Sequence, residues 1–230
     1  MPDRPYTLLS CGMSLDGYLD TAAADRLVLS NAADLDRVDG VRAGSDAILV
    51  GAATVRNDNP RLLIRGAGRR DDRIAHGMEP DPIKVTVTNS CQLDPTANFF
   101  VMGQAPKLVY CPSEAVVRAR GRLGSVATVI DAGESVDMCR VSVDLYERGV
   151  RRLMVEGGGR VLTQFLTAGL ADELQLVVAP FFVGDSAARR LVGDGDFPWN
   201  PEHRARLAEA RPIGDVVLLR YALSDRFRTG

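Results

Sequence analysis

Histidine, lysine and tryptophan are scarce in this chain of 230 residues. The two histidines, His76 and His203, lie far apart in polar surroundings, so we expect neither a histidine-based zinc site nor a Ser-His-Asp triad. The only lysines are Lys84 and Lys107, and arginine therefore carries nearly all of the positive charge. Genomic base composition explains that bias more simply than a functional need for guanidinium groups.

The chain also lacks cysteine pairs and long apolar runs. Its four cysteines, at positions 11, 91, 111 and 139, form no C-x-x-C pair, which favours buried free thiols in a reducing compartment. No run approaches the length of about 18 apolar residues that a membrane helix needs, and the N-terminal stretch does not resemble a signal peptide. The net charge of −2 would not attract nucleic acid. We expect a cytoplasmic protein without nucleic-acid or membrane partners.

Hydrophobic residues make up 46% of the chain and charged residues 25%, as in a globular protein that buries a core. We expect a single domain over residues 1–230. Apolar runs alternate with helical periods until the C-terminal part, where only strands are indicated. The predicted strands cover residues 6–11, 47–51, 85–88, 108–110, 127–130, 152–155, 173–179, 206–211 and 216–223. The predicted helices cover residues 32–42, 52–57, 113–120, 141–148 and 160–168.

Local signals support several of these elements. Ser30 and Asn31 precede the helix at 32–42, and Asp34 follows in its first turn, a start similar to a capping box. Ser113 is expected to cap the helix at 113–120. Residues 66–82, rich in charge, glycine and proline, are interpreted as an exposed excursion.

A turn signal at residues 212–215 joins the last two strands as an antiparallel hairpin. The predicted fold class is therefore α/β, with a mostly parallel central sheet flanked by helices and an antiparallel C-terminal hairpin.

Three consecutive glycines, at positions 157–159, follow a predicted strand and open the next helix. Glycine lets a ligand approach the backbone, and a helix N-terminus offers free N–H groups, so the segment suits a phosphate or pyrophosphate. The spacing is not G-x-G-x-x-G, so a Rossmann fingerprint is absent. A tight strand-to-helix turn without a ligand explains the motif equally well.

A second strand ends in Gly51 and runs into a short helix that contains Thr54, whose hydroxyl can donate to a phosphate oxygen. Asp58 stands before an Asn-Pro pair, where the chain must leave the helix. The simpler interpretation is that Asp58 caps a turn. Arg42 and Arg65 flank this stretch and suit a phosphorylated substrate, although solvated surface arginines are the default in so arginine-rich a chain.

Together these segments resemble the reductase domain of the bacterial riboflavin deaminase-reductase and its free-standing archaeal and fungal relatives. Five phrases in the same order carry the resemblance: M-S-L-D-G (13–17), R-A-x-x-D-A-I-L-V-G-x-x-T-V-x-x-D-N-P-x-L (42–62), E-R-G-V-R-R-L-M-V-E-G-G-G (147–159), G-L-A-D-E-L (169–174) and A-P-x-x-x-G (179–184). It is strong over residues 5–65 and 146–185, and loose over 66–140.

The resemblance implies a dihydrofolate-reductase-like fold, NADPH as the hydride donor and usually a homodimer. The family substrate is a ribosylamino-pyrimidine 5′-phosphate, whose ribose is opened and reduced to ribityl in riboflavin biosynthesis. The positions that match the family's cofactor site are Gly51, Thr54, Val55, Gly157, Gly158 and Gly159. The positions that match its substrate side are Ser30, Arg42, Asp58, Arg65 and Glu156. Of these, Asp58 and Glu156 are the candidate catalytic carboxylates, since either could stabilise a cationic imine.

One position departs from the bacterial pattern. Ser10 stands where the bacterial enzymes have a lysine, four residues before the serine of S-L-D-G, which puts a mechanism that needs that amine in doubt. The free-standing archaeal relatives also have a small polar residue there. No His/Cys/Cys zinc signature of a deaminase is present.

Two alternatives remain open. The chain could be a reductase of another heterocycle, such as dihydrofolate or a secondary-metabolism intermediate, because function lies in the site and not in the fold. A nucleotide-binding regulator without catalysis would keep the glycines but would not need Asp58 and Glu156.

Overall fold

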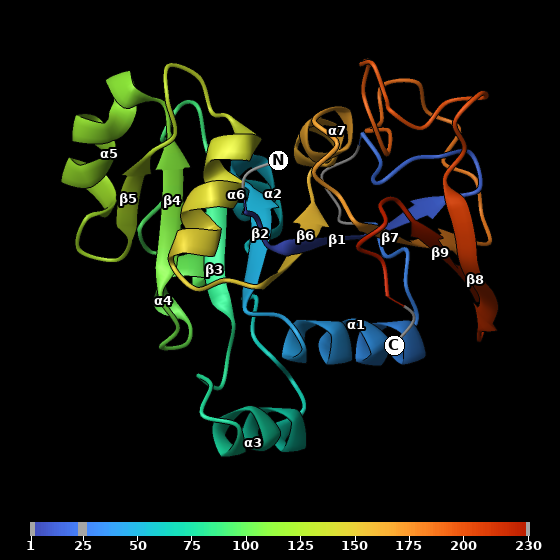
Figure 1. Ribbon diagram of the computed structural model, residues 1–230, viewed down its shortest axis with the longest axis horizontal. Helices are drawn as coiled ribbons and strands as arrows, with labels where there is room; N and C mark the ends of the chain where they lie inside the picture. Colours follow the sequence, from blue (N-terminus) through green and yellow to red (C-terminus); the bar gives the residue numbers. More distant parts are fainter. Residues whose placement is uncertain (1–2, 23–26, 229–230) are drawn as a thin grey trace. The chain divides into compact units, whose positions relative to one another are not determined.

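The computed structural model describes residues 3–22 and 27–228 (Figure 1). The chain divides into two compact units, called here the first unit (mainly Asp39–Met154) and the second unit (residues 6–38 and 155–228). Two elements cross the division. Helix α1 (Ala32–Ala43) enters the first unit after Val38, and strand β6 (Arg152–Gly157) leaves it after Met154. The single domain predicted over residues 1–230 stays a prediction.

Four parallel strands form the sheet of the first unit. In spatial order they are β2 (Ala47–Gly51), β3 (Ile83–Val87), β4 (Lys107–Cys111) and β5 (Thr128–Asp131). Every residue of β2 is buried, which is typical of a parallel strand covered on both faces and explains its uninterrupted apolar sequence. Because the strands are parallel, their carboxyl ends lie along one edge, where Gly51 pairs in register with Val87.

The helices of the first unit are α2 (Ala52–Asp58), α3 (Ala67–Ala75), α4 (Asn98–Val101), the short 3₁₀ helix η1 (Ser113–Ala115), α5 (Val116–Leu123) and α6 (Met138–Glu147). All of them except α3 bury apolar side chains, whereas the buried residue of α3 is Arg73. A buried hydroxyl fixes one of them: Tyr110 on β4 donates to the Asp144 carboxylate of α6 at 2.6 Å. None of the described helices is long and apolar enough to cross a membrane.

The second unit contains a mixed sheet. Its strands are β1 (Tyr6–Ser14), β7 (Glu173–Ala179), β9 (Val216–Ala222) and β8 (Arg206–Ile213), in that spatial order, and its helix α7 is Gly159–Thr167. β1 and β7 are parallel, whereas β9 is antiparallel to both β7 and β8. The last two strands form the predicted hairpin. Parallel pairing with an antiparallel C-terminal hairpin agrees with the predicted fold class.

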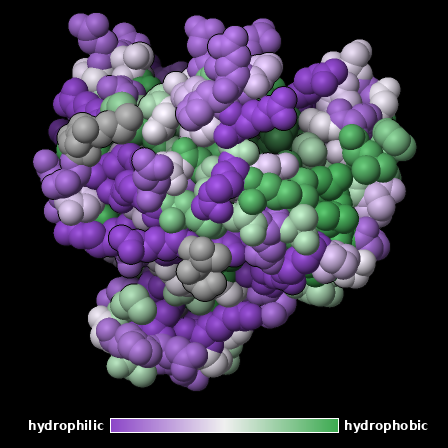
Figure 2. All heavy atoms as spheres, turned by 45° about the vertical axis from the view of Figure 1, so that its right-hand side comes forward, coloured by the Kyte–Doolittle hydropathy of each residue, from purple (hydrophilic) through white to green (hydrophobic). Residues whose placement is uncertain are grey.

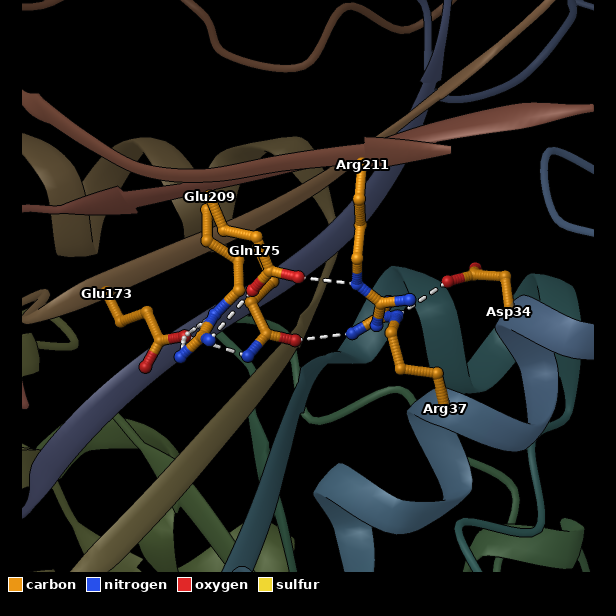
Figure 3. A network of polar contacts seen from close by, with 7 residues as sticks. Asp34, Arg37, Glu173, Gln175, Glu209 and Arg211 are labelled. Carbon is orange, nitrogen blue, oxygen red and sulfur yellow. Dashed lines mark hydrogen bonds and ion pairs between the residues drawn. The ribbon is translucent and has the colours of Figure 1, made fainter. Parts of the chain in front are cut away.

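One face of the β7-β9-β8 sheet carries a polar network that also holds α1 (Figure 3). Glu173 and Glu209 both bind the guanidinium of Arg220, each at 2.9 Å, which ties the three strands together. Gln175 accepts a hydrogen bond from Arg37 of α1, and Arg37 also pairs with the buried Asp34 at 2.7 Å. The N-terminal half of α1 is thereby fixed on this face.

The opposite face of the same three strands is apolar. The register places on it Leu174, Leu176, Val178, Tyr221, Leu219, Val217, Leu207, Ala210 and Pro212. Two of these side chains are strongly exposed, Leu207 at 51% and Val217 at 42%. Figure 2 shows a hydrophobic area on the side of the molecule that carries these strands. The helix-covered face thus carries the polar network together with a buried apolar cluster (Val177, Ile213, Val216 and Leu218), whereas the opposite face is apolar and partly exposed.

Two helices were not predicted. α4 was missed, and α3 lies in residues 66–82, where the sequence indicates only an excursion. α3 is held by a distant partner, since the buried Arg73 donates to the carbonyl oxygens of Ala43 and Ser45, both at 2.8 Å. A pattern of local residues contains no sign of such a contact.

Two smaller predictions were wrong. Ser113 does not cap α5, which begins after Ala115; the Ser113 hydroxyl donates instead to Asp131 at 2.8 Å, because the carboxyl ends of β4 and β5 lie side by side. The cysteines are free but not all buried. Cys139 is exposed because it lies in the first turn of α6, on the side away from the sheet.

Candidate functional site

In the first unit, the predicted cofactor residues lie where β2 ends and α2 begins. Gly51 is the N-cap residue of α2 and has no side chain to cap it, so the first N–H groups of the helix have no intrahelical partner. Thr54 is half-buried in the first turn. Val55 is 2% exposed, so its side chain belongs to the core. A cofactor would therefore meet the Thr54 hydroxyl and backbone groups here.

Asp58 is the last residue of α2 and is half-buried. The residue that turns the chain out of the helix is Asn59, with a left-handed backbone at φ 42°. The side-chain oxygen of Asn59 accepts a hydrogen bond from the backbone N–H of Asn98 at 2.7 Å. The backbone carbonyl oxygen of Asn59 accepts one from the side-chain amide of Asn98 at 3.1 Å. Asn59 thus stabilises the end of α2.

Arg42 and Arg65 are brought to neighbouring segments of the first unit. Arg42, in the last turn of α1, donates to the carbonyl oxygen of Leu63 at 3.3 Å. The buried carboxylate of Asp39, one turn earlier, accepts the backbone N–H of Arg65 at 2.6 Å and that of Gly66 at 3.0 Å. The Arg65 side chain is exposed. Two guanidinium groups thus flank a short stretch that α1 holds in place.

Asp39 was not singled out from the sequence. It also pairs with Arg69 at 2.9 Å. Burial by itself would raise the pKa of Asp39, but the N–H groups of Arg65 and Gly66 and the Arg69 guanidinium outweigh it and hold the pKa below its usual value. The sequence predicts that Asp39 lies on α1. It does not indicate the partners of Asp39, which lie 26 or more residues further along the chain.

In the second unit, the glycine turn joins β6 to α7. Gly157 has φ 127° and Gly158 has φ 83°, backbone conformations that residues with a side chain rarely adopt. A Cβ added to Gly157 would meet no described atom within 4 Å, so a ligand has room there. A Cβ on Gly159 would stand 2.8 Å from the carbonyl oxygen of Arg190, so close packing explains that glycine. The room for a ligand in this turn therefore lies beside Gly157.

The two predicted substrate residues of the second unit have different surroundings. The hydroxyl of Ser30 donates to the buried Asp34 carboxylate at 2.7 Å, and Asn31 accepts the Asp34 backbone N–H at 2.9 Å. Ser30 therefore takes part in the start of α1, as the predicted capping interaction suggests. Glu156 is half-buried on β6, immediately before the glycine turn. Ser10 is 5% exposed within β1.

The site residues form two groups, one in each unit. The first group is at the carboxyl end of β2 and around Arg65, and the second is at the carboxyl end of β6 and the start of α1. Among residues 3–22 and 27–228, no three His, Cys, Asp or Glu side chains are grouped so that they could hold a metal ion.

The chain is similar to known reductases along most of its length. The RibD C-terminal domain family matches residues 5–219. The 2,5-diamino-6-ribosylamino-4(3H)-pyrimidinone 5′-phosphate reductase of Archaeoglobus fulgidus is 37% identical over 182 residues, which cover 79% of this chain and 83% of that protein. The reductase of the same name from Methanothermobacter thermautotrophicus is 32% identical over 223 residues, which cover 96% of this chain and 99% of that protein.

A solved structure shares the fold. A pyrimidine reductase-like protein from Corynebacterium diphtheriae superposes with a TM-score of 0.80 at 22% identity, over 95% of this chain and 91% of that one. The resemblance found in the sequence is confirmed, and the chain shares the fold of solved structures of such reductases. The chain therefore belongs to the RibD C-terminal domain family.

Proposed function

We propose that this chain is an NADPH-dependent reductase that acts on a ribosylamino-pyrimidine 5′-phosphate and reduces its ribosyl group to ribityl, as in riboflavin biosynthesis. The observation that carries the proposal is the 37% identity to the Archaeoglobus fulgidus reductase of such a substrate, over 79% of the chain. A cytoplasmic location is part of the same proposal.

Arg42 and Arg65 hold the substrate phosphate in this proposal. Their support is the geometry of the first unit, where Asp39 fixes the backbone of Arg65 and Arg42 binds the carbonyl of Leu63. Charge-assisted hydrogen bonds from two guanidinium groups suit a phosphate. Binding energy from this remote group orients the ribosyl carbon that reacts.

In this proposal either Asp58 or Glu156 serves the reacting end of the substrate. The ribosylamine opens to an imine, which accepts a hydride more readily when it is protonated, and a nearby carboxylate stabilises that cation. When bound, NADPH supplies the hydride. We assign its binding in the first unit to the Thr54 hydroxyl and the backbone of Gly51 and Val55, and in the second unit to the glycine turn (Gly157–Gly159). The support for each assignment comes from its own unit: the start of α2 has no side-chain cap, and there is room beside Gly157.

The test is NADPH oxidation with three substrates side by side: a ribosylamino-pyrimidine 5′-phosphate, its dephosphorylated form and dihydrofolate. We expect turnover of the phosphorylated pyrimidine alone at micromolar concentration. Turnover of dihydrofolate without the pyrimidine would replace the proposal by the alternative of another heterocycle. Absence of any NADPH oxidation, with NADPH still bound in a titration, would favour a nucleotide-binding regulator.

We also propose that the protein is a homodimer in which the apolar face of β7, β9 and β8 packs against its copy. The support is the partly exposed apolar face described above, on which Leu207 and Val217 are strongly exposed. Monomeric proteins rarely expose a contiguous apolar area of this kind. A two-fold axis lets one face cover itself in both subunits.

A further inference from the structure

Asp16 joins two loops of the second unit that follow parallel strands. It lies in the turn after β1, and its Oδ1 accepts the hydroxyl of Ser14 at 2.5 Å and the backbone N–H of Val183 at 3.0 Å. Its Oδ2 accepts the backbone N–H of Gly184 at 2.8 Å. Val183 and Gly184 belong to the loop that follows β7. One carboxylate thus bridges the two loops, and we call this set of contacts the Asp16 clasp (Ser14, Asp16, Val183 and Gly184).

Backbone pairing continues the junction beyond the clasp. The N–H of Leu19 donates to the carbonyl of Arg189 at 2.7 Å, and the N–H of Leu191 donates to the carbonyl of Gly17 at 3.1 Å. Between them, Tyr18 pairs with residue 190 in an isolated antiparallel bridge. The turn that contains Asp16 and the segment 189–191 therefore form one short ribbon.

This ribbon lies directly against the glycine turn. The carbonyl oxygens of Arg190 and Leu191 would be 2.8 and 3.5 Å from a Cβ on Gly159, and Leu19 Cδ1 would be 3.5 Å from it. The next segment is tied to the same helix, since the N–H of Gly193 donates to the Thr163 hydroxyl at 2.9 Å. The backbone after β7 thus covers the start of α7.

We propose that Asp16 is a positioning residue: its carboxylate holds residues 181–191 against the glycine turn, in the arrangement that admits the cofactor phosphates. The inference rests on the proposed function. Bridging Val183 and Gly184 requires two acceptor oxygens, which a carboxylate has and an amide lacks. An Asp16 that only shaped a surface turn would need neither contact.

The Asp16 carboxylate is charged at neutral pH. The Ser14 hydroxyl, with help from the N–H groups of Val183 and Gly184, outweighs partial burial and lowers the pKa of Asp16 to about 2. It is therefore not a proton donor in the reaction. Its effect must come through the segment that it holds.

The test compares the isosteric variant Asp16→Asn with wild type in NADPH titration, steady-state kinetics and amide hydrogen exchange. We expect the Kd and KM for NADPH to rise about tenfold, the size expected from losing one charge-assisted hydrogen bond. The kcat at saturating NADPH and the KM for the pyrimidine should stay near wild type. Amides of 181–191 should exchange faster. Asp16→Glu should restore part of the NADPH affinity.

Asp172→Asn is the matched control. The Asp172 carboxylate also binds a backbone N–H, that of Thr7 at 2.9 Å, and the Ser224 hydroxyl at 2.6 Å, but it lies at the amino ends of β1 and β7. It should lower stability without changing the Kd for NADPH. If Asp16→Asn does not fold, Ser14→Ala provides the comparison, since it removes one bond of the clasp and leaves the carboxylate.

The outcomes separate the inference from the proposed function. If wild type binds no NADPH, the proposed function is wrong and the inference fails with it. If wild type binds NADPH and Asp16→Asn binds it equally well, only the inference is overturned. An equal loss of affinity in Asp172→Asn would also overturn it, because the effect would then be one of general stability.

Discussion

The backbone N–H of Arg65 donates to Oδ1 of Asp39 at 2.6 Å, which joins a candidate phosphate-binding arginine to α1. Asp39 is 3% exposed, so this bond is shielded from water. Because this bond fixes the Arg65 backbone, the Cα atom from which the exposed side chain extends has a defined position. A guanidinium held in this way loses less conformational entropy when it binds a phosphate.

Arg65→Ala should raise the KM for the phosphorylated pyrimidine about tenfold or more, since a charge-assisted hydrogen bond contributes roughly 1.5–3 kcal/mol. The Kd for NADPH should stay nearly unchanged. The measurement is steady-state kinetics with phosphorylated and dephosphorylated substrates, and the exposed Arg118→Ala is the control. Equal effects on both substrates would mean that Arg65 is structural.

Asp58→Asn should lower kcat about a hundredfold with little change in KM, because its charge matters most when the cationic imine forms; removing such a group costs roughly 2–4 kcal/mol. Glu156→Gln in the same assay identifies which of the two carboxylates stabilises the cation. The exposed Asp71→Asn should have no effect. An unchanged kcat in Asp58→Asn would remove Asp58 from the reacting end.

Gly158→Val should raise the Kd for NADPH by about tenfold or more, because a side chain blocks close approach to the backbone. The substitution also strains the backbone, which costs about 1–2 kcal/mol at positive φ. Gly149→Val is the control for that strain, since Gly149 has φ 92° and open space around a Cβ among the described residues. Calorimetric titration of both variants checks the assignment: wild-type affinity in Gly158→Val would contradict it.

Lys84 should make the free energy of unfolding rise with pH between about 8 and 10.5. Its Nζ is buried and donates to the carbonyls of Phe99 and Met102, and burial, reinforced by Lys107, lowers its pKa from 10.5 to about 8. Between these values the unfolded chain binds more protons than the folded chain, so raising the pH favours folding. The gain is about 3 kcal/mol at most.

Urea unfolding of wild type and Lys84→Met at pH 7.5, 9 and 10 measures this pH-dependent contribution of Lys84 to the free energy of unfolding. The variant removes the ammonium, so other groups that titrate in alkali cancel in the difference between the two proteins. The free energy of unfolding of wild type should increase relative to that of Lys84→Met as the pH rises. A constant difference across the series would mean that Lys84 keeps its ordinary pKa.

Leu207→Asp should convert the proposed dimer to a monomer, because a charge in the apolar face would have to be buried without a partner. Light scattering at micromolar concentration should give twice the chain mass of 24.8 kDa for wild type and the single mass for the variant. Val117→Asp, on α5 and 82% exposed, is the matched control and should remain dimeric. A monomeric wild type would contradict the proposal.

Local sequence patterns determined most of the elements. The strands β2 and β7 have the predicted bounds. Each is an apolar run that ends at a glycine or at a change of composition, so the local sequence marks both of its ends. The start of α1 was readable from Ser30 and Asn31, whose contacts lie within four residues. The family and its candidate residues were equally readable, since the motifs that carry them are contiguous.

Tertiary structure decided the rest. α3 forms where Arg73 can reach the carbonyls of Ala43 and Ser45, and Ser113 binds Asp131 instead of capping a helix. The backbone partners of the Asp16 carboxylate lie in a loop 167 and 168 residues away along the chain. A periodic pattern of apolar residues indicates which face of a helix or strand is buried, and it depends only on residues that are close together in the chain. The partner of a hydrogen bond between distant segments depends on strand order and register, which exist only once the sheet has formed.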